Sequence, residues 1–311
     1  MVHEQVQTDT ADDADILLPA TTSMEHEDFY RSFGHLYVQH ADPVIEPQGK
    51  PQGEAKSNWQ VFRLLARALG MKDRHYERPL SDLVSAHLRA SGPAFHGITY
   101  ERLRGERTVR LSLPRPFMPF ADGAPTPSGK VEFYSETLAR QGLPPLPTYV
   151  PLRESADDPQ IAVRYPLRCH VPPNRVFLNS SFSRSALFRK RQAGPAVFIH
   201  PEDAAARALA PGDLVALRND RGRGLFTAVL TDDTPAGQVV VEGIWWHKFM
   251  RGARGVNVLT SDRVADLGGG PAFHSTMVEA VRADPGEGAV GPRPAREGLD
   301  ADRGAIAGGG A

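Results

Sequence analysis

A regular alternation of short apolar runs and turn sequences between residues 165 and 280 constrains the fold of this chain more than any other feature. The runs have strand length and are rich in β-branched or aromatic residues, and Pro, Gly, Asn and Asp separate them. Closely spaced short strands of this kind predict a closed barrel or a sandwich. The acidic residues Glu202 and Asp203 predict one short helix among the strands. The apolar runs are Val197–Ile199, Leu214–Leu217, Leu225–Leu230 and Val239–Val241.

Several longer motifs follow one another in this region: LNSSFSR, IHPEDAAARALAPGDLVALRNDRG, DDTPAGQVVVEGIWW, VNVLTSD and GGGPAFHS. Together they closely resemble the C-terminal domain of the molybdopterin oxidoreductases, a family that includes dimethyl sulfoxide reductases, formate dehydrogenases and nitrate reductases. The resemblance implies a six-stranded double-psi β-barrel that binds a molybdopterin guanine dinucleotide. We place this molybdopterin dinucleotide-binding domain at residues 155–282.

The start of the chain carries the signals of an αβ unit. A helix is predicted near Asp9–Ala14, and the apolar run Ile16–Leu18, which ends at Pro19, predicts a buried strand of an open parallel sheet. In the family, the motif at Thr8–Thr21 lies in the middle of a much longer chain, in a doubly wound domain with earlier strands upstream. We therefore expect a partial doubly wound α/β domain ahead of the barrel, in a C-terminal portion of a longer enzyme. A split gene, a truncated gene or a late start codon could each produce such a chain.

Two amphipathic helices and a proline-rich linker complete the first 150 residues, which we assign to the α/β domain. The helix at Trp59–Leu69 has apolar residues at three- and four-residue spacing, which predicts one buried stripe. The other helix is predicted at Pro79–Gly92. Prolines between Gly105 and Thr148 favour extended chain, with a strand only at Lys130–Tyr134. The predicted stripe consists of Trp59, Phe62, Leu65, Ala66 and Leu69.

The last segment, residues 283–311, consists mostly of Gly, Ala, Pro and charged residues. Such a composition cannot bury enough apolar area to offset the loss of chain entropy. The sequence therefore predicts a disordered tail after the barrel.

The overall composition excludes several classes of protein. The net charge of −1 at pH 7 gives no electrostatic basis for binding nucleic acid or an anionic membrane. No apolar run approaches the roughly 18 residues of a membrane span, and the polar, acidic N-terminus is unlike a secretory signal. We therefore expect a cytoplasmic location. The single cysteine, Cys169, excludes intrachain disulfides and four-cysteine metal sites, and its place on a predicted strand favours a buried apolar filler.

The sequence contains no motif of a self-sufficient active site. HExxH, GxSxG and P-loop patterns are missing, and the histidines are dispersed rather than paired on a helix. We therefore predict no catalytic residue and no metal ligand in this chain. In the family, a Cys, selenocysteine, Ser or Asp upstream of the matched region holds molybdenum or tungsten, and any iron–sulfur cluster lies in that upstream part. The resemblance implies that these elements belong to an N-terminal half that is missing or lies on a partner chain.

Four residues of the α/β part match positions at which the nitrate-reductase branch of the family contacts its cofactor. His3 and Glu4 fall at a strand end, near the nucleotide half, where a carboxylate at Glu4 can accept hydrogen bonds from guanine. His26 stands where that branch has Lys, and Asn58 stands where it has Asp. Asn58 offers an amide instead of a charge, which implies weaker binding or another mode. For His3, a frayed terminus is an equal alternative.

A loop of the barrel part also matches the family. The segment from His170 to Ser181 corresponds to the family's first cofactor loop, and it contains Asn179 and Ser180 as well. These residues follow a strand and offer short polar groups to a pterin or a phosphate. An Asn in a loop also commonly satisfies turn backbone, so that simpler role stays open for Asn179.

Three later positions of the barrel part match as well. Asn257 and His274 correspond to cofactor contacts, and Phe249 corresponds to a packing position that precedes them. The nitrate-reductase branch has Lys where His274 stands, and an imidazole can still donate a hydrogen bond there, with a charge that depends on pH. Phe249 equally fits a core or wall residue.

The resemblance implies the cofactor-binding part of a molybdopterin-dependent oxidoreductase, an enzyme that performs two-electron redox chemistry or oxygen-atom transfer on a small substrate. Because the upstream half is missing from this chain, we expect no turnover by the chain alone. Two alternatives stay open: a non-catalytic cofactor-binding subunit that needs a partner chain with the N-terminal half, and a truncated gene remnant. An upstream reading frame for that half, with co-purification, would favour the subunit.

Overall fold

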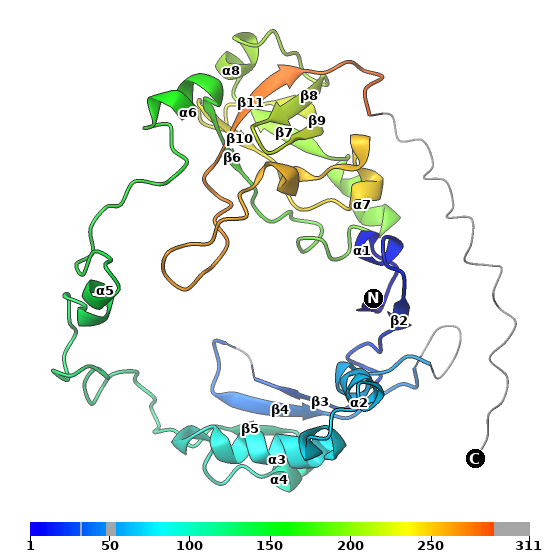
Figure 1. The fold of residues 1–311 in the computed structure, drawn as a ribbon, viewed down its shortest axis with the longest axis vertical. Coiled ribbons are helices and arrows are strands. Elements are labelled where there is room, and N and C mark those ends of the chain that lie inside the picture. Colours follow the sequence, from blue (N-terminus) through cyan, green and yellow to red (C-terminus); the bar gives the residue numbers. More distant parts are fainter. Residues whose placement is uncertain (32, 48–53, 289–311) are drawn as a thin grey trace, which may run out of the picture. The chain divides into compact units, whose positions relative to one another are not determined.

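The computed structural model describes residues 1–31, 33–47 and 54–288 of the chain. The chain divides between Thr148 and Tyr149 into two compact units, a mixed α/β unit and a unit built on a β-barrel (Figure 1). Among the described residues, each helix is too short or too polar to span a membrane. This order of an α/β part and a barrel agrees with the fold class predicted from the sequence.

The α/β unit begins with a small parallel sheet. β1 (Val2–Glu4) pairs in parallel with β2 (Leu17–Pro19), and helix α1 (Asp9–Asp12) lies between them in the sequence. The Thr8 hydroxyl caps α1 by accepting a hydrogen bond from the Ala11 amide at 3.2 Å. The predicted helix and strand are therefore both present.

The prediction that the strand at Ile16–Leu18 is buried was wrong. Ile16 and Leu17 are 54% and 45% exposed. Within the described residues, β1 pairs with β2 alone, and β2 continues into one parallel bridge between Ala20 and Lys56. Parallel strands are normally covered on both faces, so this sheet presents apolar residues that the unit does not bury itself.

Helix α2 (Asn58–Ala68) confirms the first of the predicted amphipathic helices. It begins at a capping box, in which Ser57 accepts a hydrogen bond from the Gln60 amide and the Gln60 side chain accepts one from the Ser57 amide. Val61 and Ala66 are its buried residues.

The predicted buried stripe on α2 was wrong at two positions. Phe62 is 65% exposed and Leu69, just after the helix, is 76% exposed. These residues are seven positions apart, which is about two helical turns, so they lie on the same face. That face has no cover from the part of the chain that the structure describes.

A second, antiparallel sheet carries the main core of the α/β unit. Its strands, in spatial order, are β3 (Asp28–Tyr30), β4 (Tyr37–Ala41) and β5 (Thr108–Arg110). Helices α3 (Leu80–Ala90) and α4 (Tyr100–Glu106) pack against it. The sequence did not predict this sheet, because residues 35–54, which include β4, are rich in Pro, Gly and Gln, a composition that favours irregular structure. The core includes Val38, Val84, Leu88, Leu103 and Val109.

The linker segments contain little regular structure. The 3-10 helices η1 (Arg74–Glu77) and η2 (Pro93–Phe95) precede α3 and α4. In residues 111–148, all of which are described, α5 (Glu136–Arg140) is the only helix or strand. The strand predicted at Lys130–Tyr134 is not formed, because no neighbouring segment pairs with it.

The second unit is organised around a closed six-stranded barrel, as the resemblance implied. The strands follow one another around it in the order β10–β6–β11–β8–β9–β7. The pairs β10–β6 and β7–β9 are parallel, and the other pairs are antiparallel. The strands are β6 (Leu167–His170), β7 (Ala196–Ile199), β8 (Leu214–Arg218), β9 (Arg223–Leu230), β10 (Gln238–Val240) and β11 (Thr276–Arg282).

The barrel strands bury an aliphatic core, which explains their short apolar runs. Leu167, Val215 and Leu217 are fully buried in it. Cys169 is buried among them, and burial raises the pKa of its thiol to about 12. The prediction that this cysteine serves as an apolar filler is confirmed.

Short helices connect the barrel strands. α6 (Pro159–Arg164) precedes β6, α7 (Ala186–Gln192) precedes β7, and α8 (Pro201–Ala205) follows β7. α8 is the predicted short helix, and the His200 ring caps it by accepting a hydrogen bond from the Glu202 amide at 3.2 Å. Between β10 and β11 lie η3 (His247–Phe249), η4 (Arg251–Ala253) and η5 (Val256–Leu259).

The segment predicted as a disordered tail starts at residue 283. Its larger part, residues 289–311, lies outside the described residues. At its first residue the prediction was wrong, because Ala283 is buried in a small cluster with Ala216 and Leu225. The barrel unit therefore extends past the end of β11.

Candidate cofactor-binding site

A tight turn after β6 carries three of the predicted cofactor residues. The Asn174 carboxamide orders the loop by accepting hydrogen bonds from two following backbone amides. Asn179 adopts a left-handed backbone conformation with φ 49°, and the Ser181 amide donates to the Leu178 carbonyl oxygen at 2.8 Å. Asn179, Ser180 and Ser181 are all exposed. The turn therefore presents an amide and two hydroxyls on a defined backbone.

Aromatic residues anchor this turn from behind. The Trp246 indole donates from Nε1 to the Ser180 carbonyl oxygen at 2.8 Å. Trp246 stacks on Phe249, with ring centroids 6.0 Å apart and planes at 9°. The Arg189 guanidinium of α7 lies 3.8 Å from the Phe249 ring centroid. The structure thus places Phe249 as a packing residue that joins η3 to α7.

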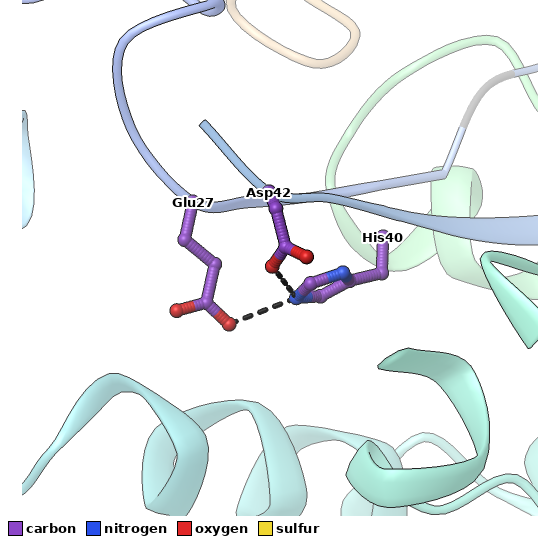
Figure 2. A group of neighbouring side chains, drawn as sticks. All are labelled: Glu27, His40 and Asp42. Atoms are coloured by element: carbon purple, nitrogen blue, oxygen red, sulfur yellow. Dashed lines mark hydrogen bonds and ion pairs between the residues drawn. The ribbon is translucent and has the colours of Figure 1, made fainter. Parts of the chain in front are cut away.

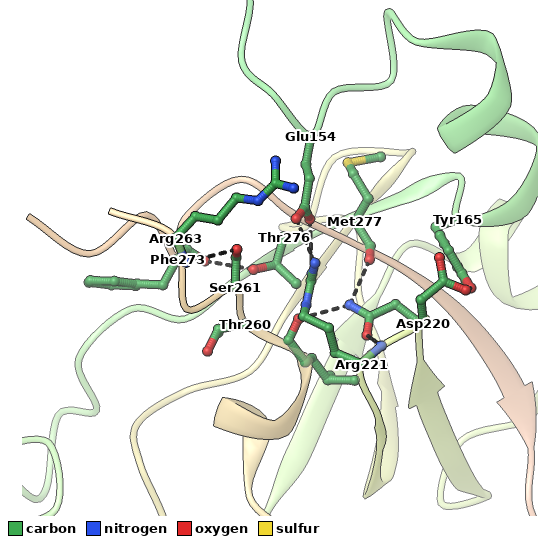
Figure 3. A network of polar contacts seen from close by, with 12 residues as sticks. Glu154, Tyr165, Asp220, Arg221, Thr260, Ser261, Arg263, Phe273, Thr276 and Met277 are labelled. Carbon is green, nitrogen blue, oxygen red and sulfur yellow. Dashed lines mark hydrogen bonds and ion pairs between the residues drawn. The ribbon is translucent and has the colours of Figure 1, made fainter. Parts of the chain in front are cut away.

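The η5 segment presents Asn257 at the barrel surface, and two side chains fix the end of this segment. Asn219 donates from Nδ2 to the carbonyl oxygens of Leu259, at 2.8 Å, and Met277, at 3.2 Å. Arg221 donates from Nε to the same Leu259 carbonyl at 2.8 Å (Figure 3). The Asn257 side chain is exposed and makes no hydrogen bond within the described part of the chain.

Glu154 and Gly222 help to fix the contact between Arg221 and η5. The Arg221 guanidinium forms two hydrogen bonds, of 2.6 and 2.9 Å, with the Glu154 carboxylate (Figure 3). Gly222 permits the close approach of η5, because a Cβ at this position would lie 2.8 Å from the Val258 carbonyl oxygen. The position of Asn257 therefore depends on residues that lie about 35 to 100 positions away in the sequence.

The pairing of β6 with β11 brings His170 and His274 into one neighbourhood. His170 ends β6, and Thr276, two residues after His274, pairs with Cys169. Burial, then the charge of Arg168, and also His274, lower the pKa of His170 below its usual value, although one hydrogen bond raises it. The His170 ring is therefore neutral at pH 7, with one nitrogen that can accept a hydrogen bond.

Three predicted residues of the α/β unit gather at the carboxyl ends of β1 and β2. Nε2 of His3 lies 3.1 Å from the carbonyl oxygen of Lys56, which is two residues before Asn58. Thr21 donates its backbone amide to the same carbonyl at 3.2 Å, and its hydroxyl lies 2.9 Å from Nδ1 of His26. The bridge at Lys56 thus connects His3, His26 and the start of α2.

Glu4 lies at the same strand ends, as the last residue of β1. Its carboxylate accepts a hydrogen bond from the Gln5 amide at 2.8 Å and is half-exposed. Asn58 is the first residue of α2, and because Ser57 caps the helix, the Asn58 carboxamide is left exposed. The carboxyl ends of parallel strands and helix N-termini are the places where open α/β sheets bind nucleotides.

A further polar cluster, which sequence reasoning missed, lies on the antiparallel sheet. Glu27, His40 and Asp42 each offer a metal-type ligand atom, and these atoms lie within 4.8 Å of one another (Figure 2). Nε2 of the buried His40 lies 2.8 Å from Oε1 of Glu27, and Nη1 of Arg107 lies 3.2 Å from Nδ1. Because a guanidinium can only donate, Nδ1 is the acceptor and Nε2 carries the proton.

Hydrogen bonds within the protein already engage the ligand atoms of this cluster. A hydrogen bond from Arg107, at 2.5 Å, lowers the pKa of Asp42. Burial raises the pKa of Glu27, but hydrogen bonds from His40 and from the Tyr100 hydroxyl outweigh it and hold that pKa below its usual value. A cation would have to displace the Nε2 proton and the Arg107 contact. The cluster therefore ties β4 to α4, and local sequence could not mark it, because Glu27, Tyr100 and Arg107 lie far in the sequence from His40 and Asp42.

Each unit by itself presents polar residues that suit the recognition of a heterocycle or a phosphate. Exposed carboxamides, hydroxyls and imidazoles can pair with the edges of guanine and pterin, and a neutral His170 can accept from a ring N–H. A diphosphate needs cations or backbone amides. α7 carries three basic residues in its last turn, close to the turn that holds Ser180: Arg189, Lys190 and Arg191.

Comparison with known proteins agrees with both parts of the chain. The family model for Molybdopterin oxidoreductase matches residues 1–68, and that for Molydopterin dinucleotide binding domain matches residues 171–277. The probable oxidoreductase YoaE of Bacillus subtilis is 38% identical over 282 residues, which cover 90% of this chain and 39% of YoaE. The dimethyl sulfoxide reductase DmsA of Escherichia coli is 31% identical, over 88% of this chain and 36% of its own. This chain thus spans about two-fifths of the length of these relatives.

A solved structure has the same fold. Acetylene hydratase from Pelobacter acetylenicus aligns with a TM-score of 0.70 at 23% identity, over 90% of this chain and 40% of that chain. At this identity the likeness concerns the fold alone. The ordered motifs, the closed barrel, the two family models and the relatives agree with one another. This chain belongs to the molybdopterin oxidoreductase family, of which it contains the dinucleotide-binding domain.

Proposed function

We propose that this chain is the C-terminal, cofactor-binding part of a molybdopterin-dependent oxidoreductase and that it holds a molybdopterin guanine dinucleotide. One observation carries the proposal: each family match contains exposed or half-exposed polar residues that hydrogen bonds to the backbone hold in place. When bound with molybdenum or tungsten, this cofactor supplies two-electron redox chemistry or oxygen-atom transfer. The relatives named above include a reductase and a hydratase, so this fold serves more than one reaction.

In the α/β unit, we assign the nucleotide half of the cofactor to the ends of β1 and β2. The Glu4 carboxylate can accept hydrogen bonds from the guanine N1–H and amino group. His3 and His26 are held in place by the Lys56–Thr21 bridge and can donate or accept through their second ring nitrogens. Asn58 adds a carboxamide at the N-terminus of α2.

In the barrel unit, which we assign to residues 155–282, the turn Asn179–Ser181 offers hydroxyls and an amide to the pterin or the diphosphate. Asn257 offers a carboxamide from the anchored η5, and His274 offers an imidazole beside the neutral His170. Phe249 stacks on Trp246, which is hydrogen-bonded to the turn. We assign the metal ligand and any iron–sulfur cluster to the other part of the enzyme.

Cofactor content tests this proposal. The full chain would be produced in a bacterial host that makes the cofactor, and the pterin and guanine nucleotide released on denaturation would be quantified per chain. We expect both in equal amounts, and we expect Glu4→Ala and Asn257→Ala to lower the content by about tenfold or more, as for the loss of hydrogen bonds to a charged or buried group. Gln141→Ala, an exposed change on the linker, is the matched control. A chain that carries neither component contradicts the proposal.

A subunit that works only with a partner is the second candidate, favoured by the exposed apolar residues of α2 and β2. The partner would supply the metal ligand and the substrate-binding surfaces. On either candidate, we expect the isolated chain, loaded with cofactor, to show no reductase or dehydrogenase turnover. Turnover by the purified chain alone would refute the assignment of the metal ligand to another part of the enzyme.

A further inference from the structure

The turn between β8 and β9 contacts both barrel segments that carry the later predicted cofactor residues. Asn219, the first residue of this turn, donates from Nδ2 to the carbonyl oxygen of Leu259 at 2.8 Å and to that of Met277 at 3.2 Å. Leu259 follows Asn257 by two residues in η5, and Met277 follows His274 by three residues at the start of β11. One side chain therefore joins the bases of the two segments.

The loop between Asn257 and His274 has few contacts that could fix their spacing. Residues 262–269 are all exposed. The loop folds back on itself through a bridge between Val264 and Pro271, and this contact holds the loop to itself and not to the barrel. Exposed loops of this kind are more mobile than the elements that they connect. The relative position of the two residues is therefore set where the loop leaves and rejoins the barrel.

The chemistry of Asn219 suits this task. Its Oδ1 accepts hydrogen bonds from the backbone amides of Arg221, at 3.0 Å, and Gly222, at 3.4 Å, so the turn itself orients the carboxamide. The Nδ2 group carries two hydrogens, one for each of the two carbonyl oxygens. Arg221, which Glu154 holds, adds a second donor to the Leu259 carbonyl at 2.8 Å (Figure 3).

The next residue of the same turn has contacts of another kind. The Asp220 carboxylate accepts a hydrogen bond from the Tyr165 hydroxyl at 2.7 Å and forms an ion pair with Arg164 (Figure 3). These contacts lead to the start of the barrel unit and not to η5 or β11. The side chains of Arg164 and Asp220 are 58% and 63% exposed, and an exposed ion pair contributes little to stability. Asp220 is therefore a matched neighbour for comparison with Asn219.

We infer that Asn219 is a positioning residue that sets the spacing between Asn257 and His274 for cofactor binding. The inference rests on the proposed function, which assigns these two residues to the cofactor. Loss of the two Nδ2 donors would release η5 and the start of β11 at once. The cofactor would then dissociate faster, although both of the residues that contact it are intact.

The variant Asn219→Asp tests the inference with the smallest change of shape. It keeps the Oδ1 acceptor that forms the turn and replaces Nδ2 by an oxygen that cannot donate. In the full chain without cofactor, nitroxide labels at Asn257→Cys and His274→Cys would report their distance distribution by electron paramagnetic resonance. Cys169 stays unlabelled, because it is fully buried and its thiol has a pKa of about 12. We expect a broader distribution in Asn219→Asp and no change in the control Asp220→Asn.

An unchanged distribution in folded Asn219→Asp would overturn the inference. If this variant does not fold, Arg221→Gln, which loses the donor to Leu259 alone, should still broaden the distribution, and no broadening there overturns the inference as well.

A second readout uses the unlabelled chain loaded with cofactor. We expect Asn219→Asp to release the pterin about five- to tenfold faster, as for the loss of a hydrogen bond or two, and Asp220→Asn to stay within about twofold. Equal release from the two variants contradicts the inference. A chain that holds no cofactor but shows the broadening refutes the proposed function and supports the spacing role. Bound cofactor with an unchanged distribution does the reverse.

Discussion

The barrel and the first αβ segment solve the problem of sheet edges in opposite ways. The barrel closes six strands into a ring and fully buries Leu167, Ile199 and Leu217 inside it. β1 and β2 form a two-stranded sheet that leaves Phe62 and Leu69 exposed on the adjoining helix. A closed sheet has no free edge, whereas a parallel open sheet needs other segments on its sides and faces. The comparison suggests that the barrel is stable by itself and that the αβ segment depends on what covers it.

The largest expected effect lies in the barrel core. Leu217→Ala removes a fully buried side chain, so we expect the free energy of unfolding of the barrel to fall by about 2–5 kcal/mol. Urea unfolding monitored by the fluorescence of the barrel tryptophans would measure it. A loss below about 1 kcal/mol would contradict the difference drawn between the two regions, because it would mean that the barrel core is loosely packed.

Loss of the η5 anchor is the next largest effect. Asn219→Ala removes the donor to the carbonyl oxygens of Leu259 and Met277, which should cost about 1–3 kcal/mol. Hydrogen exchange of the Thr260 amide, which donates to the Asn257 carbonyl, should become faster. Asn58→Ala serves as an exposed control on the other unit, and equal exchange in both variants would argue against an anchoring role.

A smaller effect depends on pH. Because the pKa of His170 in the folded barrel is below its ordinary 6.5, folding favours the neutral ring. This contribution to stability is fully present above pH 6.5 and is lost as the pH falls through the folded pKa. We expect barrel stability to decline over that range, and to decline less in His170→Gln. Burial is the main cause of this lowered pKa and the charge of Arg168 adds to it, so in an NMR titration Arg168→Gln should move the His170 midpoint upward; an unchanged midpoint would refute the contribution of Arg168.

The smallest effect should come from the exposed face of α2, which carries Phe62 and Leu69. In the chain alone, Leu69→Ser changes an exposed residue and should alter the free energy of unfolding by no more than about 0.5 kcal/mol. A large loss of stability in the isolated chain would mean that this surface is already covered, and it would remove the contrast between the two regions.

The barrel was predictable because its signals are local. Its strands are short apolar runs between turns, and the runs Val197–Ile199 and Leu214–Leu217 coincide with β7 and β8 almost residue for residue. The antiparallel sheet was missed because β4 and β5 pair across a separation of about 70 residues, whose described part includes three α-helices and two 3-10 helices. The stripe on α2 was predicted to be buried because periodicity reports which residues are apolar, not whether a second surface is present to cover them.

The candidate site was predictable in a different sense. Its residues were identified from a family resemblance. The structure adds which of them are connected by strand pairing or by hydrogen bonds. The proximity of His170 and His274 follows from the β6–β11 pairing, and the connection of His3 to His26 runs through a bridge at Lys56. Neither could be derived from local sequence, because both depend on long-range strand pairing.

The strand order of the barrel also has a consequence for synthesis. β6 is made first, yet its neighbours in the ring are β10 and β11, which are made last. During translation, β6 has no strand partner until Val240 has left the ribosome, and it gains its second partner only after Arg282 has left it; such long-range pairing forms slowly. A chain that stops before Thr276 would leave both β6 and β8 with an open side, so a short deletion at this end should affect the yield of folded protein more than its length suggests.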